Sequence, residues 1–294
     1  MMESASTLPS SAVTRFAPSP TGHLHLGHAY SALFAEEQAR RPGGRFILRL
    51  EDIDRTRCRP EFEDAIYEDL DWLGLEWEKP VRRQSDHMDD YAQVLDELRE
   101  MGLLYPCFCT RKDIQQEIAG AANAPHGPDG PIYPGTCRSL SAVERKRRLD
   151  SGEAHALRLD MTAATGQAGT LFWRDRERGR IEASPQIFGD VVLARKDTPT
   201  SYHLAVTLDD HLQGVSLVTR GTDLFEATHV HRLLQELLGW AVPDYHHHAL
   251  LVGADGKRYA KRDRSLTIRA LRQKGLSPED ARRMATPEGS AEIG

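Results

Sequence analysis

The sequence predicts an α/β protein built on a parallel sheet, and three observations favour this class. A short apolar run at residues 12–17 leads through a proline-containing turn into helix-forming residues 29–40. A second apolar run, Arg45–Leu50, follows, so the three segments form a β-α-β unit whose strands are expected to be parallel. Further along, strand-like runs precede a leucine-faced helix at residues 228–238. In open α/β sheets a nucleotide is expected at the carboxyl ends of the strands.

The remaining elements are predicted from the spacing of apolar residues and from the positions of proline and glycine. Residues 61–73 and 89–101 carry apolar side chains at helical spacing and are expected to cover the sheet. Residues 124–135 are crowded with proline and glycine, which marks a loop. Short alternating runs then predict strands and a hairpin. The expected elements after that loop are strand-like runs in 154–183, a hairpin across 174–180, and strands at 191–193, 202–206 and 215–219.

Composition excludes several classes of protein. The chain has 294 residues and a formal charge of −6, which argues against a generic nucleic-acid coat. The first ten residues resemble no leader peptide, and no segment is apolar for long enough to span a bilayer. We therefore expect a cytoplasmic monomer with neither membrane nor DNA as a partner. Basic clusters at 145–148 and 257–274 are each explained by solvation, but beside a nucleotide site they become candidate phosphate contacts.

Residues 16–28, Phe-Ala-Pro-Ser-Pro-Thr-Gly-His-Leu-His-Leu-Gly-His, place polar chemistry where the first helix begins. His25 and His28 are expected to share a face of its first turn. A helix N-terminus attracts anions through its unpaired N–H groups and partial positive charge, and imidazoles there can follow phosphate charge as it moves. Gly27 leaves room for a flat ring near the backbone. An ordinary loop before a capped surface helix is the alternative when the run is read alone.

This stretch carries a family resemblance. Residues 15–28 resemble the first signature of class I aminoacyl-tRNA synthetases, and most closely the glutamyl branch, which begins Arg-x-Ala-Pro-Ser-Pro-Thr-Gly. The resemblance implies a Rossmann-like parallel sheet and catalytic roles for His25 and His28 at the phosphates of ATP, which binds with Mg²⁺. It also implies that Gly27 lies beside the nucleotide.

Residues 255–262 resemble the second signature of the same family, a mobile lysine loop. Lys261 matches its catalytic lysine, which also binds ATP. The ammonium group would stabilise the charge that develops when an amino-acid carboxylate attacks the α-phosphorus. The chain departs from the pattern at Arg258 and Ala260, where the family has lysine and serine, so weaker loop closure is expected. A solvated basic hairpin is the alternative for the segment alone.

A glutamate pocket requires arginine for the carboxylates and an acid for the ammonium, because buried charges must be paired. Arg15, Glu51 and Arg220 each lie at or just beyond the carboxyl end of a predicted strand. An amide substrate would leave arginine charge uncompensated, which should favour glutamate over glutamine by roughly 3–5 kcal/mol. Ordinary surface salt bridges are the alternative for any one residue. The resemblance assigns Arg15, Tyr202 and Arg220 to carboxylate, Ser19 and Glu51 to the ammonium, and Phe16, Ala17 and Pro18 to the same pocket.

Three cysteines bracket the Pro/Gly-rich loop at 107, 109 and 137. Nearby thiols in a cytoplasmic chain favour zinc over a disulfide. Spacing alone makes His126 the natural fourth ligand, because imidazole is a commoner zinc ligand than phenol. Zinc-bearing short relatives of glutamyl-tRNA synthetases, however, use Cys-x-Cys followed by Tyr-x-x-x-Cys, and residues 133–137 match that pattern. The resemblance therefore implies one structural zinc ion held by Cys107, Cys109, Tyr133 and Cys137.

The three consecutive histidines 246–248 are not expected to form a metal site. Neighbouring residues of an extended segment point to opposite faces, so the three side chains cannot reach one ion. Core or surface roles are expected for these histidines, and the alternative is that one of them lines the ATP site.

Only 32 residues follow Arg262, and one short helix beginning at Ser277 fits there. A separate anticodon-reading domain is not expected, since independent domains need at least ~50 residues. Over about residues 13–270 the chain resembles the short glutamyl-queuosine tRNA(Asp) synthetases. That family implies activation of L-glutamate by ATP and transfer of the glutamyl group to queuosine at the wobble position of tRNA(Asp). A compact enzyme that charges the 3′ end of a tRNA and a non-catalytic RNA-binding relative remain as alternatives.

These expectations combine into one predicted organisation, with a zinc-bearing insertion and a short C-terminal helical segment added to the Rossmann-like sheet. Its parts are a flexible tail at 1–11, the first part of the catalytic domain at 12–105, the insertion with the zinc site at 106–184, the second part of the catalytic domain at 185–250, and the lysine loop with a helical C-terminal segment at 251–294.

Overall fold

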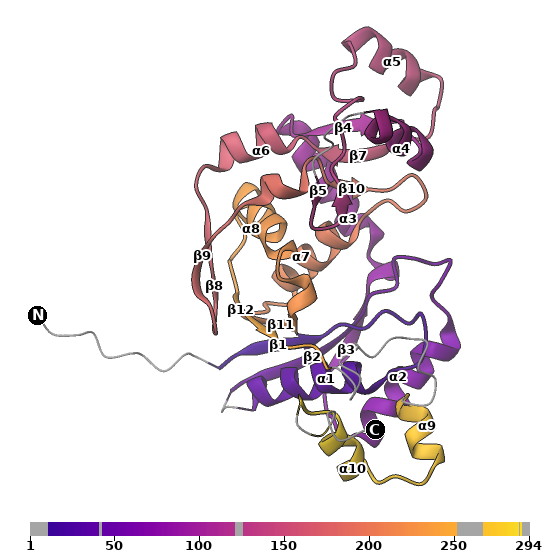
Figure 1. Cartoon of the computed structure of the whole chain (residues 1–294), viewed down its shortest axis with the longest axis vertical. Helices are drawn as coiled ribbons and strands as arrows, with labels where there is room; N and C mark the ends of the chain where they lie inside the picture. The colour runs from indigo at the N-terminus through magenta and orange to yellow at the C-terminus, as the bar shows by residue number, and fades with distance from the viewer. Residues whose placement is uncertain (1–10, 41–42, 121–125, 252–266, 288, 290–294) are drawn as a thin grey trace, which may run out of the picture.

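A computed structural model describes residues 11–40, 43–120, 126–251, 267–287 and 289. Its centre is a largely parallel sheet with helices on both faces (Figure 1). Two hydrogen bonds join Ser216 to Val13, because the N–H of Ser216 donates to the Val13 carbonyl and the N–H of Val13 donates to the Ser216 hydroxyl. These bonds place strand β11 beside strand β1. The predicted α/β fold with a parallel sheet is confirmed. Its parallel pairs join β1 (Val13–Phe16) to β2 (Arg45–Leu50), β2 to β3 (Glu78–Arg83), β11 (Leu217–Gly221) to β12 (Asp244–His248), and β12 to β8 (Phe172–Asp175).

Helices cover the two faces of this sheet. Figure 1 shows α1 and α2 on one side with the C-terminal helices, and α7 and α8 on the other. None of the helices within the described ranges is long and apolar enough to cross a membrane. The helices around the sheet are α1 (Leu26–Ala39), α2 (Pro60–Trp72), α3 (Met88–Glu100), α7 (Tyr202–Leu212), α8 (Ala227–Leu237), α9 (Ile268–Gln273) and α10 (Pro278–Met284).

Small side chains let α1 lie close to the sheet. Its fully buried face carries Ala29, Ala32 and Ala35 behind Leu26. The hydroxyl of Thr14 in β1 donates to the carbonyl of Ala35 at 2.7 Å, a contact that a bulkier helix face would prevent. The close packing fixes the start of α1 at the carboxyl end of β1, where the site is expected.

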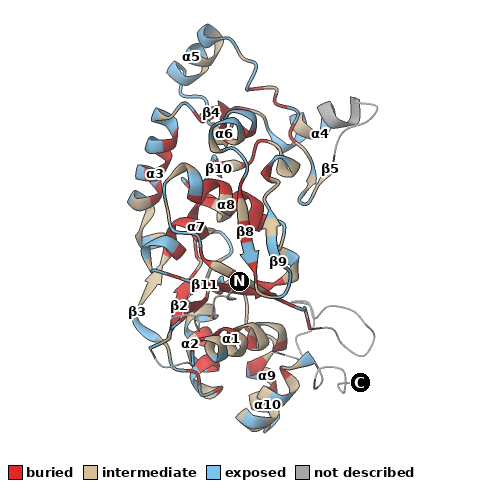
Figure 2. Ribbon diagram, turned by 90° about the vertical axis from the view of Figure 1, so that its left-hand side faces the viewer, coloured by how far each residue is buried: buried red, intermediate tan, exposed pale blue. Residues whose placement is uncertain are grey.

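A second unit lies at the far end of the molecule. It centres on a three-stranded antiparallel sheet in the order β10-β7-β4. Helix α5 projects furthest and has no buried residue (Figure 2). The elements of this unit are β4 (Leu104–Cys107), α4 (Arg111–Gly120), β5 (His126–Gly127), β6 (Gly130–Pro131), α5 (Ala142–Asp150), β7 (Ala156–Leu159), α6 (Met161–Ala168) and β10 (Val192–Ala194).

The hairpin expected across residues 174–180 is confirmed. Strand β8 pairs antiparallel with β9 (Gly179–Glu182), and Arg174 lies opposite Arg180. The hairpin extends the large sheet, because Tyr245 of β12 pairs with Asp175 of β8. The limits of the insertion, 106 and 184, remain a prediction, but the hairpin near its end belongs to the same sheet as β11 and β12.

The expectation of a strand at residues 202–206 was wrong. These residues form the first turns of α7, which is buried from Leu204 to Asp210. Over five residues the spacing of apolar side chains does not distinguish a buried helix from a buried strand. Both can be apolar on every face, so neither shows a polar side that would reveal its period.

The strand-like runs expected throughout residues 154–183 were wrong in part, because Met161–Ala168 form the helix α6. Only two side chains of this short helix are buried, Met161 and Ala164, so its sequence carries little helical periodicity. The helices predicted at 61–73, 89–101 and 228–238, the strands predicted at 45–50, 191–193 and 215–219, and the helix that begins at the Ser277 cap lie within a few residues of their observed positions.

Candidate active site

A cavity of about 330 Å³ opens where β1, β2 and β11 end and α1 begins. Five segments far apart in the sequence supply its walls, as a parallel sheet requires at its carboxyl edge. All but one of the residues predicted for catalysis, ATP or glutamate line it. They are Arg15, Phe16, Ala17, Pro18, Ser19, His25, Gly27, His28, Glu51, Tyr202 and Arg220. The exception, Lys261, lies outside the described residues, as do Arg258 and Ala260.

The first turn of α1 holds two imidazoles against each other. His25 is the N-cap: its Nδ1 accepts from the backbone N–H of Gly27 at 3.1 Å, and the Nδ1 of His28 accepts from the N–H of His25 at 3.2 Å. The ring centroids are 3.7 Å apart. A Cβ on Gly27 would lie 3.0 Å from the His25 ring, so glycine lets that ring fold over the backbone. The helix N-terminus and both rings therefore face one cavity, as an anion site requires.

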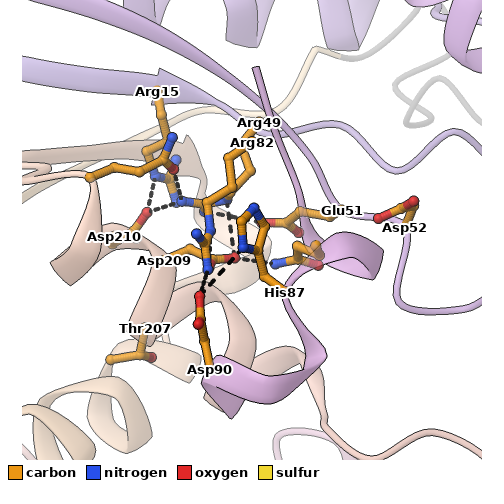
Figure 3. Close-up of polar contacts among 12 residues, drawn as sticks. Arg15, Arg49, Glu51, Asp52, Arg82, His87, Asp90, Thr207, Asp209 and Asp210 are labelled. Carbon is orange, nitrogen blue, oxygen red and sulfur yellow. Dashed lines mark hydrogen bonds and ion pairs between the residues drawn. The ribbon is translucent and has the colours of Figure 1, made fainter. Parts of the chain in front are cut away.

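A buried network of alternating charges supports the floor of the cavity (Figure 3). Asp210 of α7 lies between two arginines, 3.0 Å from the Nε of Arg15 and 2.8 Å from the Nη1 of Arg49. Burial alone would raise the pKa of Asp210, but these two guanidinium groups lower it below its ordinary value. Asp209 next to it binds Arg82 at 2.7 Å. Arg15 and Arg49 are therefore compensated within the protein.

Glu51 is placed to receive a cation. Its Oε1 lies 3.2 Å from the Nη2 of Arg49, and it lines the cavity. Burial raises the pKa of Glu51, although Arg49 and Arg15 oppose this shift. The ammonium group of a ligand bound in the cavity would oppose this rise in pKa and stabilise the ionised carboxylate.

Arg220 differs from the other two arginines of the site. It is 6% exposed, and it donates to Thr228 Oγ1 at 2.6 Å, to His247 Nε2 at 3.1 Å and to the hydroxyl of Tyr202 at 3.4 Å. Its Nη1 also lies 3.2 Å from Nδ1 of His231. Within the described part of the chain no carboxylate lies within 4.0 Å of its guanidinium group.

The histidines around Arg220 stay neutral. Burial, followed by the charge of Arg220, lowers the pKa of His203 and of His247 to about 4 and that of His231 well below its ordinary value. Neutral imidazoles accept hydrogen bonds without cancelling the guanidinium charge. Among the described residues, Arg220 is therefore a buried cation of the cavity without an anionic contact, which is the feature expected of an anion-binding subsite.

Several residues of the site were missed by sequence reasoning, namely Arg49, Asp210, Thr228, His231 and His247. The one available signal was spacing. Tyr202, Val206 and Asp210 follow at i, i+4 and i+8, so a helix would have placed the acid on the same face as the predicted tyrosine. His248 lines the cavity, so the alternative given for the three consecutive histidines, and not the core or surface role expected for them, applies to this residue.

The three predicted cysteine ligands come together in the antiparallel unit. Their Sγ atoms lie within 4.8 Å of one another, and the hydroxyl of Tyr133 is 3.4 Å from Cys107 Sγ and 3.5 Å from Cys109 Sγ. Zinc–sulfur bonds of about 2.3 Å in a tetrahedron place sulfurs roughly 3.8 Å apart, so the donor set fits zinc. The guanidinium of Arg158 lies 3.8 Å from the centroid of the Tyr133 ring, a cation–π contact that holds this ring in place. The side chain of the alternative ligand, His126, lies outside the described part.

Replacing Cys137 with serine is expected to remove most of the bound metal. A structural zinc ion contributes about 10–16 kcal/mol in small zinc domains, and this energy is also folding energy. Metal analysis after dialysis should give one zinc ion per wild-type chain and well under half of that for Cys137→Ser. Cys58 stands apart from the cluster, so Cys58→Ser is the matched control and should retain the metal. Equal zinc in both variants would contradict the assignment.

The family model of class I tRNA synthetases (E and Q), catalytic domain, matches residues 11–292. The chain belongs to this family. A protein of Rhodobacter capsulatus named glutamyl-Q tRNA(Asp) synthetase is 50% identical over 92% of this chain and 99% of its own length. A Symbiobacterium thermophilum protein of the same name is 42% identical over 90% of this chain and 82% of its own length.

A solved structure supports the same family. The glutamate tRNA ligase of Elizabethkingia meningosepticum, crystallised with its amino acid, superposes with a TM-score of 0.78 at 28% identity. The match covers 97% of this chain, and the chain spans 61% of the length of that ligase. Membership of the class I tRNA synthetases makes the chain a ligase for which ATP and Mg²⁺ are expected, and the fold expected from residues 15–28 is confirmed.

Proposed function

We propose that the chain activates L-glutamate with ATP and transfers the glutamyl group to queuosine at the wobble position of tRNA(Asp). One observation carries the choice of amino acid: Arg220 lines the cavity as a buried cation whose hydrogen-bond partners in the described ranges are neutral. A side-chain carboxylate satisfies it and an amide does not, because a buried charge without a counter-charge costs roughly 3–5 kcal/mol.

In the first step an oxygen of the α-carboxylate attacks the α-phosphorus of ATP, and the bond to pyrophosphate breaks. We propose that Arg220 and Tyr202, with Arg15 beside them, hold the side-chain carboxylate, while Ser19 and Glu51 bind the ammonium. This arrangement leaves the α-carboxylate directed toward the first turn of α1. The residues from 16 to 18 form the remaining wall of the amino-acid pocket.

The phosphates are assigned to the start of α1. His25 and His28, together with the N–H groups of the turn at Gly27, would bind the triphosphate and follow its charge as pyrophosphate leaves. Mg²⁺ bound to ATP would neutralise part of the phosphate charge. Lys261 is proposed to add a second cation, on the strength of the resemblance of its loop. Positioning and electrostatic stabilisation account for most of such a step.

In the second step the acceptor attacks the carbonyl carbon of glutamyl-adenylate, and AMP leaves. The names of the relatives from Rhodobacter capsulatus and Symbiobacterium thermophilum support queuosine-containing tRNA(Asp) as the acceptor. We propose that the four ligands at 107, 109, 133 and 137 hold one structural zinc ion and stabilise the unit at the far end of the molecule. Four protein ligands leave no position for water, so the ion would take no part in either step.

These substrates place the activity in the cytoplasm. We propose that the chain acts as a monomer, because its own described residues already supply the groups assigned to glutamate. Neither a membrane nor DNA is needed for the reaction.

The acceptor is tested by incubating the protein with labelled glutamate, ATP and tRNA(Asp) that carries or lacks queuosine. Label should appear only on the modified tRNA and should survive removal of the 3′-terminal adenosine. Label that is lost with that adenosine would instead identify a compact glutamyl-tRNA synthetase. If the wild-type protein exchanges no pyrophosphate into ATP in the presence of glutamate and tRNA, it is a non-catalytic relative.

A further inference from the structure

The hairpin of β8 and β9 brings a carboxylate close to Arg220 without contact. Asp175, the last residue of β8, is 1% exposed and is absent from the cavity lining. Its Oδ2 lies 2.8 Å from the ring Nδ1 of His247, and its Oδ1 accepts from the N–H groups of Glu177 at 2.9 Å and Arg178 at 3.1 Å. Both oxygens are therefore in use, one for the hairpin turn and the other for the histidine.

The carboxylate fixes the tautomer of His247. Burial would raise the pKa of Asp175, but hydrogen bonds from His247 and from the turn lower it, so the group is an acceptor only at neutral pH. The proton of the neutral imidazole must then lie on Nδ1, which leaves Nε2 as an acceptor. This Nε2 faces the Nε–H of Arg220 at 3.1 Å. The orientation of the guanidinium group thus depends on which imidazole nitrogen carries the proton.

We propose that Asp175 and His247 form a positioning pair that orients Arg220 toward the side-chain carboxylate of glutamate and thereby sets selectivity against the amide. The inference rests on the function proposed above. A carboxylate in direct contact with Arg220 would compete with the substrate, whereas a protein with no acid nearby would bear the full burial cost of the cation. A neutral imidazole between them holds the guanidinium in place and leaves its charge available to a ligand.

Asp175→Asn tests the pair because one amide cannot replace both carboxylate oxygens. Its oxygen can retain the turn at Glu177 and Arg178, which leaves the NH₂ group facing His247. The imidazole must then accept at Nδ1 and carry its proton on Nε2, where it opposes the Nε–H of Arg220. We expect the KM for glutamate in pyrophosphate exchange to rise ~10–100-fold, as for other residues that orient a functional side chain, with kcat changed less than about threefold. The kcat/KM preference for glutamate over glutamine should fall with it.

A matched control lies in the same turn. Glu177 is two residues away, and its Oε1 lies 3.2 Å from Nε2 of His246, which does not line the cavity. Glu177→Gln should leave the KM for glutamate unchanged. In the double variant Asp175→Asn with His247→Gln, the glutamine can offer its oxygen to Arg220 without help from residue 175. This variant should therefore have a lower KM than Asp175→Asn alone.

The tautomer is read directly by ¹⁵N NMR of histidine-labelled protein, with the His247 signals assigned from the His247→Gln spectrum. Wild type should show a protonated Nδ1 at His247, and Asp175→Asn a protonated Nε2. If Asp175 had a purely structural role, Asp175→Asn would change the stability of the protein but not which nitrogen of His247 carries the proton. An unchanged tautomer, or an unchanged KM in Asp175→Asn while wild type exchanges normally, would overturn the inference. Absence of exchange in wild type would instead reject the proposed function and leave the tautomer result standing.

Discussion

Arg220→Gln is expected to lower kcat/KM for glutamate in pyrophosphate exchange by roughly 10²–10⁴-fold, the equivalent of about 3–5 kcal/mol for a lost buried charge pair. Arg220 lines the cavity, and its hydrogen-bond partners among the described residues are neutral, so its charge is available mainly to a ligand. The preference for glutamate over glutamine should disappear with the charge. Steady-state exchange with both amino acids measures the two effects together.

Arg232→Gln is the control for this change. Arg232 lies on α8, where it donates to the carbonyl of Phe172 and to the carboxylate of Glu236, and it does not line the cavity. Its removal should leave the amino-acid preference intact. If Arg220→Gln preferred glutamate over glutamine as strongly as wild type does, another group would have to bind the side-chain carboxylate.

The second large effect concerns stability. Asp210→Asn is expected to lower the free energy of unfolding by about 3–5 kcal/mol at pH 7, because it leaves Arg15 and Arg49 buried beside a neutral amide. Urea unfolding measures this difference. The exposed pair of Asp197 and Arg195 provides the control, and Asp197→Asn should change stability by less than about 1 kcal/mol. Similar losses in the two variants would contradict the role given to Asp210.

The same residue predicts a pH dependence. The pKa of Asp210 is lowered in the folded protein, so its contribution is complete above the unfolded value of about 3.9 and is lost as the pH falls through the lower folded value. The difference in unfolding free energy between wild type and Asp210→Asn should therefore be constant from pH 7 to pH 5 and shrink in stronger acid. A difference that grows on acidification would have the wrong sign.

The local features of this protein could be predicted from its sequence. The β-α-β unit and the histidine-bearing turn of α1 depend on patterns within about ten residues, and the structure has them where they were expected. The thiol cluster was also expected. Its two short motifs flank a single loop, so they come together without contacts between distant parts of the chain. The residues expected in the amino-acid pocket followed from a resemblance and line one cavity.

The sequence by itself thus determined the fold class, the family and the residue types of the site. Only the tertiary structure decided how the charges of the site are balanced. Arg15 meets Asp210 across 195 residues of chain, and Asp175 meets His247 across 72. Periodicity reports the local backbone and the face that is buried, whereas a pair of buried charges depends on which distant strands and helices become neighbours. The same limit hid the helix at Tyr202, whose burial on every side removed the pattern that distinguishes a helix from a strand.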